Sequence, residues 1–357
     1  MPYDIQTNAF LPYMLVALTY LAILAMGGRQ RDRLAFILML AFCVALGLRD
    51  TNKMSIWADP VWYAAILTRQ IPQSAILAKG GVDYSIFFLV HGLTSRVLNY
   101  SSAFFLLNIL YVPPLYLLYR LTREMEGMFF LLAGWLLFIN SGILLLTNFF
   151  RQGQATLYLL VLILAFSIPA GAQWIRGIGA VLLPLLHISS APFAFGLFAQ
   201  KRRRFYQVFS ITFSAFIVLA YIYLKASPQY AEYFSDPNAA FFTRDLWIKI
   251  IGAYAILACG FFIARKIDFN ASEAAGRIKH TAVGLLIPTA ALAFFAWSAP
   301  QLGTRFIYYF HAIAFLYIAL VVAARKSREL FTASALVFCF FGAITWTYPT
   351  VTVLLKW

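Results

Sequence analysis

The chain has 357 residues, of which 62% are hydrophobic and only 11% are charged, and its formal net charge is +15. Soluble domains carry roughly 45 to 50% apolar and about 25% charged residues, so this composition excludes a soluble globular protein. The mean hydropathy of +0.79 extends along the whole chain, which also excludes a single membrane anchor on a soluble domain.

Long apolar runs rich in Leu, Ala, Phe and Ile follow one another along the sequence. They do not alternate with polar residues, as the strands of a membrane barrel would. A span needs about 20 apolar residues, so the chain has room for roughly ten to twelve spans. We predict an all-α polytopic membrane protein with one integral membrane domain over residues 1–357. The predicted spans are residues 10–26, 34–48, 101–119, 127–148, 153–170, 205–224, 246–264, 281–298, 306–324 and 330–348.

Two apolar segments do not fit a simple span. Residues 84–98 are too short to cross and contain His91 and Gly92, so we expect an interfacial or re-entrant helix. Residues 174–199 contain Pro184 and Pro192, which predict two half-length helices with His187 near the tip of a hairpin.

The basic residues predict the orientation, because cytoplasmic loops of membrane proteins gather Lys and Arg. With the N-terminus outside, most basic residues fall in cytoplasmic loops, and the C-terminus is also outside. In a membrane protein the charge of +15 therefore indicates topology first, and we expect no nucleic-acid partner. The predicted cytoplasmic residues are Arg29, Arg31, Arg33, Arg120, Arg123, Arg176, Lys201, Arg202, Arg203, Arg204, Arg265, Lys266, Arg277, Lys279, Arg325, Lys326 and Arg328.

Three arginines on the predicted outer side, Arg49, Arg151 and Arg305, lie at the ends of separate spans. Each could extend its head group to the membrane interface, as long basic side chains often do. Three arginines at one level are more simply explained by a common anionic ligand, above all a phosphate that accepts paired hydrogen bonds from guanidinium groups. The other cations expected outside are Lys53, Arg69, Lys79, Arg96, Lys225, Arg244 and Lys249.

The two predicted outer loops, about 49–83 and 225–245, combine carboxylates with aromatic residues. The first contains Asp50, Asp59 and Asp83 together with Trp57 and Tyr63. Aromatic faces can stack on sugar rings, and a carboxylate can remove a proton from an attacking hydroxyl group. The alternative for the aromatic residues is a belt at the level of the lipid head groups. The second loop could close over the first as a lid.

His187 is the histidine that the sequence marks for chemistry, because an imidazole in a membrane segment must be paired or face water. It could act as a general base or donate a proton to a leaving phosphate oxygen. The alternative is a neutral histidine bonded to a backbone carbonyl that a neighbouring proline exposes. Because the sequence has no metal-binding or phosphate-cradling motif, we expect a metal-independent reaction without a cofactor.

Seven short motifs follow one another between residues 47 and 310: Gly47, Leu48 and Arg49; Asp59 and Tyr63; residues 83–87; residues 104–108; residues 150–155; Leu186, His187, Ser189, Ser190 and Ala191; and Gly303, Thr304, Arg305, Tyr308 and Tyr309. The order of these motifs resembles that of the EpsG-like branch of the Wzy bacterial polysaccharide polymerases. Two positions depart from that pattern: Asp50 or Asp59 could fill the acidic position, and Asp83 stands where a Glu is expected.

The resemblance implies a GT-C-like glycosyltransferase of the bacterial inner membrane, with its active site facing the periplasm. It would transfer a growing glycan from undecaprenyl diphosphate to the non-reducing end of another lipid-linked oligosaccharide repeat unit. Membrane lipids and a chain-length regulator are the other implied partners. The implied roles are catalysis by His187, Asp59 or Asp50, diphosphate binding by Arg151, Arg305 and Arg49, and sugar binding by Asp83, Trp57, Tyr63 and Tyr308.

Three other functions remain open at the level of the sequence. An O-antigen ligase would use the same donor, but ligases usually have a longer outer loop between late spans. A lipid-linked oligosaccharide flippase or other transporter would be expected to show internal repeats and charges in the middle of the membrane. A scaffold without activity would leave the outer arginines unexplained.

Overall fold

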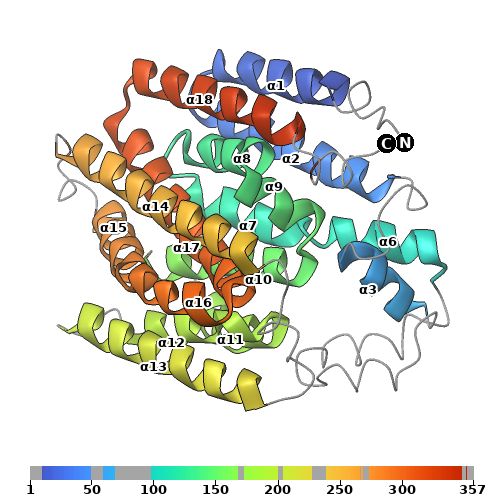
Figure 1. The fold of residues 1–357 in the computed structure, drawn as a ribbon. Coiled ribbons are helices and arrows are strands. Elements are labelled where there is room, and N and C mark those ends of the chain that lie inside the picture. Colours follow the sequence, from blue (N-terminus) through green and yellow to red (C-terminus); the bar gives the residue numbers. More distant parts are fainter. Residues whose placement is uncertain are drawn as a thin grey trace. The chain divides into compact units, whose positions relative to one another are not determined.

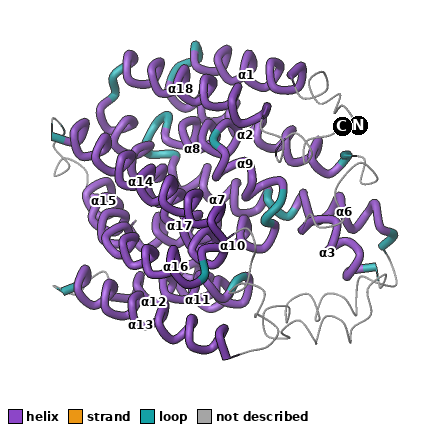
Figure 2. The backbone as a smooth tube through the Cα atoms, in the orientation of Figure 1, coloured by secondary structure: helices purple, strands orange, loops and turns teal. Residues whose placement is uncertain are grey.

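The computed structural model describes residues 10–49, 59–68, 98–167, 173–199, 204–226, 239–265, 267, 273–347 and 351. Every regular element in this part of the chain is a helix, and short turns join most neighbouring helices (Figure 2). The predicted all-α class is therefore confirmed. Asp50, Trp57, Asp83 and most of the expected interfacial segment 84–98 lie outside the described residues.

The chain forms two compact units. Unit 1 contains the described residues up to Leu157 and those from Lys326 onward, and unit 2 contains Tyr158 to Arg325. Helix α10 (Phe150–Ser167) begins in unit 1 and ends in unit 2.

Unit 1 packs around α8, in which every residue is buried. Helices α2, α9 and α18 contact α8, and α1 lies beside α18 (Figure 1). The Tyr20 ring of α1 stacks on Phe130 of α8 at a centroid distance of 4.2 Å, and the Trp346 indole of α18 donates to the Leu137 carbonyl over 2.8 Å. The helices of unit 1, besides the start of α10, are α1 (Phe10–Leu24), α2 (Gly28–Gly47), α3 (Asp59–Leu67), α6 (Tyr100–Ile109), α7 (Val112–Thr122), α8 (Met128–Phe138), α9 (Asn140–Thr147) and α18 (Arg328–Thr347).

The predicted span 127–148 is bent in the structure, because α8 and α9 meet at an angle of 77°. Gly142 lies one turn after the bend, where a Cβ atom would be 2.3 Å from the Trp135 carbonyl oxygen. Only glycine permits this close approach of the two backbones. In contrast, α6 and α7 together form a span over Tyr100–Thr122, close to the predicted 101–119.

Unit 2 packs around α17, which contacts α14, α15 and α16. Phenylalanine rings from several helices fill its core, including Phe193, Phe213 and Phe310. The other elements of unit 2, besides the end of α10, are α11 (Gln173–Leu186), η3 (Ile188–Ser190), α12 (Ala191–Ala199), α13 (Phe205–Ala226), α14 (Ala239–Ala264), α15 (Glu273–Leu286), η6 (Ile287–Leu292), α16 (Ala293–Ser298) and α17 (Pro300–Arg325).

Proline residues explain two interruptions in unit 2. The predicted break in residues 174–199 is confirmed, since α11 ends at Leu186 after Pro184 and α12 follows a short η3. The predicted single span 281–298 is instead divided into α15, η6 and α16, with Pro288 in η6. Proline has no amide hydrogen to donate, so the α-helical pattern changes at this residue.

Seven described helical segments are long and apolar enough to cross a membrane, or eight if the bent pair α8 and α9 counts as one span. Fewer spans are therefore found in the described residues than the ten to twelve expected. Helix α1 has only 15 described residues, and α2 begins with several charged ones. Exposed apolar side chains on α13 and α14, such as Leu219 and Phe262, are typical of a surface that contacts lipid. The protein is thus a multi-pass helical membrane protein.

Candidate functional site

The predicted site residues that the structure describes are divided between the two units. In unit 1, Arg49 follows α2, Tyr63 lies in α3 and Arg151 is in the first turn of α10. Asp59 begins α3, but its side chain lies outside the described part. In unit 2, His187 lies between α11 and η3, while Arg305 and Tyr308 lie in α17.

Arg49 is buried at the end of α2 with only 4% of its surface exposed. Its Nε donates to the Leu46 carbonyl over 2.8 Å, and its Nη2 donates to the Asn108 side-chain oxygen over 3.5 Å. The guanidinium also lies 5.6 Å from the centre of the Phe104 ring. The Asn108 amide is held in turn by donating to the Phe104 carbonyl over 2.8 Å. Helix α6 thereby fixes the orientation of Arg49.

Arg151 is buried to a similar degree, with 8% of its surface exposed. Its Nε donates to the Tyr63 hydroxyl over 2.7 Å, and its guanidinium lies 5.5 Å from the centre of the same ring. The side chain of Tyr63, in α3, is itself buried. A contact between α3 and α10 therefore orients this second arginine.

Aromatic residues connect the surroundings of the two arginines. The Tyr63 ring packs against Phe150 at 5.9 Å, and Phe150 packs edge-on against Tyr111 at 5.6 Å. Burial lowers the pKa of Arg49 to about 10, and the nearby Tyr111 acts in the opposite direction. Arg49 is thus still a cation at neutral pH. We call this set the two-arginine cluster; it consists of Arg49, Tyr63, Asn108, Tyr111, Phe150 and Arg151.

The two-arginine cluster has the chemistry of an anion-binding site. A guanidinium offers five N–H donors in a planar fork that matches phosphate and carboxylate oxygens. Burying such a group is costly, so buried arginines in membrane proteins generally mark a functional region or a specific pairing. The hydrogen bonds to Leu46, Asn108 and Tyr63 hold both guanidinium groups in defined orientations.

His187 in unit 2 belongs to a chain of hydrogen bonds. Its Nδ1 is hydrogen-bonded to the Ser189 hydroxyl, which donates to the Tyr309 hydroxyl over 3.2 Å. Because a hydroxyl group can both donate and accept, this contact orients the imidazole ring in either tautomer. The neighbouring Ser190 hydroxyl donates to the carbonyls of Leu183 and His187.

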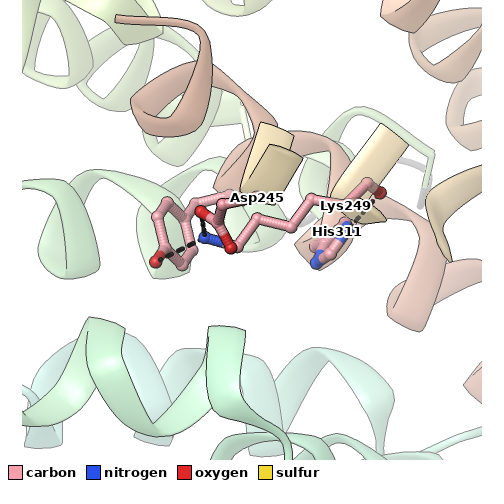
Figure 3. Close-up of polar contacts among 4 residues, drawn as sticks. Asp245, Lys249 and His311 are labelled. Carbon is pink, nitrogen blue, oxygen red and sulfur yellow. Dashed lines mark hydrogen bonds and ion pairs between the residues drawn. The ribbon is translucent and has the colours of Figure 1, made fainter. Parts of the chain in front are cut away.

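A second polar group in unit 2 joins α14 to α17. Lys249 Nζ donates to Asp245 Oδ2 over 2.5 Å and to the Tyr308 hydroxyl over 3.3 Å. Figure 3 shows the Asp245 carboxylate facing the Lys249 ammonium, with the His311 ring beside the Lys249 backbone carbonyl. That carbonyl accepts from His311 Nε2 over 2.7 Å, so Nδ1 of His311 carries the lone pair. Among the described residues, nothing hydrogen-bonds to this buried Nδ1.

The sequence reasoning missed this second group as a unit. Lys249 was predicted to be one of the cations on the outer side, and Asp245 was predicted to be the last residue of the second outer loop. Both residues lie in α14 instead. The four-residue spacing of Asp245 and Lys249, and the three-residue spacing of Tyr308 and His311, place each pair on one helix face. These two spacings are the features of the sequence that could have predicted the group.

Arg305 differs from the other two predicted diphosphate ligands, because its side chain is exposed rather than buried. It lies near the start of α17, one turn before Tyr308. Within the described residues, no three His, Cys, Asp or Glu side chains lie close enough together to hold a metal ion.

The fold and these polar clusters define the class of protein as a multi-pass helical membrane protein with buried basic groups. Comparison of the chain with protein-family models, with curated proteins and with solved structures finds no match.

Proposed function

We propose that this protein is a membrane glycosyltransferase that acts on lipid-diphosphate-linked glycans, in the manner of a bacterial polysaccharide polymerase. A growing glycan would be transferred from undecaprenyl diphosphate to the non-reducing-end hydroxyl of a second lipid-linked repeat unit. The glycosidic bond forms as the bond between the glycan and the diphosphate breaks, and the acceptor hydroxyl loses a proton. The enzyme would work in the bacterial inner membrane, with its site on the outer face.

The two-arginine cluster is the observation that carries this proposal. Arg49 and Arg151 are both buried, and Asn108 and Tyr63 hold their guanidinium groups in fixed orientations. A leaving diphosphate gains negative charge as the glycosidic bond breaks, and oriented cations stabilise that charge without reorganising. The guanidinium fork also suits the paired oxygens of a diphosphate.

His187 is the proposed base for the acceptor hydroxyl, with Asp59 and Asp50 as the alternatives from the sequence. Its hydrogen bond to Ser189 holds the imidazole ring in one orientation, as a general base requires. Tyr308 is the proposed sugar-binding residue of α17, where Lys249 contacts both its hydroxyl and its ring.

The direct test uses purified full-length protein in detergent with synthetic lipid-diphosphate repeat units. We expect a ladder of longer glycans on gels or by mass spectrometry, and we expect it to persist in EDTA. Arg49→Ala and Arg151→Ala should each abolish the ladder. Arg328→Ala, which removes an exposed arginine of the same unit, should leave it intact. The proposal is refuted if the wild-type protein does not lengthen the glycans. It is also refuted if both Arg49→Ala and Arg151→Ala still lengthen them.

A transporter of lipid-linked oligosaccharides is the second candidate, and the Asp245, Lys249 and His311 group favours it. These residues lie within the candidate spans Thr243–Ala264 and Gly303–Arg325. Ionisable residues inside membrane spans often mark the path of an ion or a substrate. In proteoliposomes, a transporter would move a fluorescent lipid-linked sugar across the bilayer without lengthening it, and Lys249→Met should slow this movement.

A further inference from the structure

A basic pocket lies in unit 1 between the start of α2 and the end of α7. Its volume is about 590 Å³. It is at the opposite end of α2 from Arg49, a separation of roughly 30 Å for a helix of 20 residues. The residues that define it are Arg29, Arg33, Tyr116, Tyr119, Arg120 and Arg123.

The pocket has an excess of positive charge. Asp32 also lines it, but both oxygens of this carboxylate already accept amide hydrogens of α8, from Gly127 over 2.7 Å and from Phe130 over 2.9 Å. Arg29 has a long ion pair of 3.7 Å with the exposed Glu126. In the part of the chain that the structure describes, the guanidinium groups of Arg33 and Arg123 have no hydrogen bond or ion pair.

The helix ends make an anion still more favourable at this position. The N-terminus of α2 carries the positive end of the helix dipole and has no acidic residue in its first turn. Arg29 and Arg33 add two cations to that end, where cations are disfavoured. Glu126 lies beside this end and pairs with Arg29, and a bound anion would add to that compensation for the other arginines.

Two tyrosines give the pocket a defined wall. The Tyr116 hydroxyl accepts a hydrogen bond from Arg120 over 3.1 Å. The Tyr119 ring stacks on Phe36 with a centroid distance of 5.2 Å. Arginine forks beside phenol groups offer several N–H and O–H donors to one tetrahedral anion.

We propose that this pocket binds a phosphate group, presented by an anionic phospholipid or by a soluble phosphate compound. Arg120 and Arg123 flank Thr122, the last residue of the candidate span Tyr100–Thr122, so the pocket lies where a span meets the head-group layer. The sequence predicts that this is the cytoplasmic side, where anionic lipids attract basic clusters. The site is separate from the two-arginine cluster and does not depend on the glycosyltransferase proposal.

The test compares wild type with the double variant Arg33→Gln/Arg123→Gln. The matched control is Arg204→Gln/Arg265→Gln, which removes two exposed arginines outside the pocket and changes the net charge equally. In the lipid arm, native mass spectrometry measures phosphatidylglycerol retained from mixed micelles, with phosphatidylcholine as the neutral reference. In the soluble arm, inorganic phosphate and pyrophosphate are titrated at constant ionic strength while thermal unfolding is followed.

A lipid site predicts that wild type and control retain phosphatidylglycerol, whereas the pocket variant retains about tenfold less. A site for soluble phosphate predicts that phosphate raises the unfolding temperature of wild type and control but not of the pocket variant. Thermal unfolding without ligand shows whether the pocket variant still folds. If it folds and matches the control in both arms, the proposal is overturned. If it does not fold, Arg123→Lys and Tyr116→Phe replace it and face the same two criteria.

Discussion

Arg151 and Tyr63 lie 88 positions apart in the sequence, yet the Arg151 Nε donates a hydrogen bond to the Tyr63 hydroxyl over 2.7 Å. Tyr63 lies in the short helix α3, and Arg151 lies in the first turn of α10. The bond therefore makes α3 responsible for the orientation of a buried cation on a different helix. The resemblance to polymerases implied sugar binding by Tyr63, whereas this contact gives it a positioning role toward Arg151.

Tyr63→Phe should slow glycan lengthening by about 10- to 150-fold, since a hydrogen bond to a charged group contributes about 1.5 to 3 kcal/mol. The phenyl ring retains the packing against Phe150, so the fold should persist. The rate of ladder formation at saturating substrate measures the effect. Tyr223→Phe is the control, because Tyr223 is exposed on α13. An unchanged rate for Tyr63→Phe would show that the hydroxyl does not orient Arg151.

Ser189→Ala should lower the lengthening rate by about tenfold or more, because it interrupts the path from His187 to Tyr309. The imidazole would lose the hydroxyl group that orients its ring. The rate is measured together with the unfolding temperature, so that a loss of activity can be separated from a loss of fold. Ser210→Ala, at a half-buried position on α13, provides the comparison. Equal rates for the two variants would contradict a role for His187 through Ser189.

Asp245 and Lys249 should show strong coupling in a double-mutant cycle. The Lys249 side chain is 12% exposed and that of Asp245 is 28% exposed, so either single variant leaves one charge largely excluded from water. Lys249→Met and Asp245→Asn should each lower the free energy of unfolding, on the order of 2 kcal/mol. The double variant should lose clearly less than the sum of the two. Additive losses, measured by denaturant unfolding in detergent, would mean that the pair does not interact.

Gly153→Ala should destabilise unit 1 by about 1 to 3 kcal/mol through overpacking. A Cβ atom at this position would be 2.0 Å from the Leu145 carbonyl oxygen and 2.8 Å from the Tyr111 hydroxyl. Gly177→Ala in α11 is the control, because no atom lies within 4 Å of its added Cβ and alanine is the better helix former. Thermal unfolding compares the two. A neutral result at Gly153 would show that α9 and α10 separate easily.

Asp32 should make the protein less stable as the pH rises from about 4 to about 6. Burial raises the pKa of this carboxyl from 3.8 to about 6, against the hydrogen bonds from Phe130 and Gly127 that lower it. Between pH 4 and pH 6 the Asp32 carboxyl is protonated more in the folded state than in the unfolded state. The contribution of Asp32 to the free energy of unfolding is therefore greatest below pH 4 and falls as the pH rises through 6. Asp32→Asn should remove this contribution. Unfolding temperatures at a series of pH values measure it; the same slope in wild type and Asp32→Asn would refute the assignment.

The composition and the apolar runs were sufficient to predict an all-α membrane protein, and Pro184 with Pro192 predicted the break near His187. These are local properties, because apolar length and a missing amide hydrogen act within one segment. The 77° bend between α8 and α9 was not predicted, although a Cβ atom at Gly142 would clash with the Trp135 carbonyl in the bent arrangement.

The partners of the site residues were decided by the tertiary structure. The sequence identified Arg49 and Arg151 as charges at the ends of apolar runs, but it did not indicate that Asn108 and Tyr63 would orient them. Nor did it indicate that Lys249 of α14 would also contact Tyr308 of α17. Helices that are apolar on most faces carry little information about which neighbour each face meets. In a membrane the sequence therefore determines the helical class and the positions of charge along the chain, while packing between distant helices determines what that charge contacts.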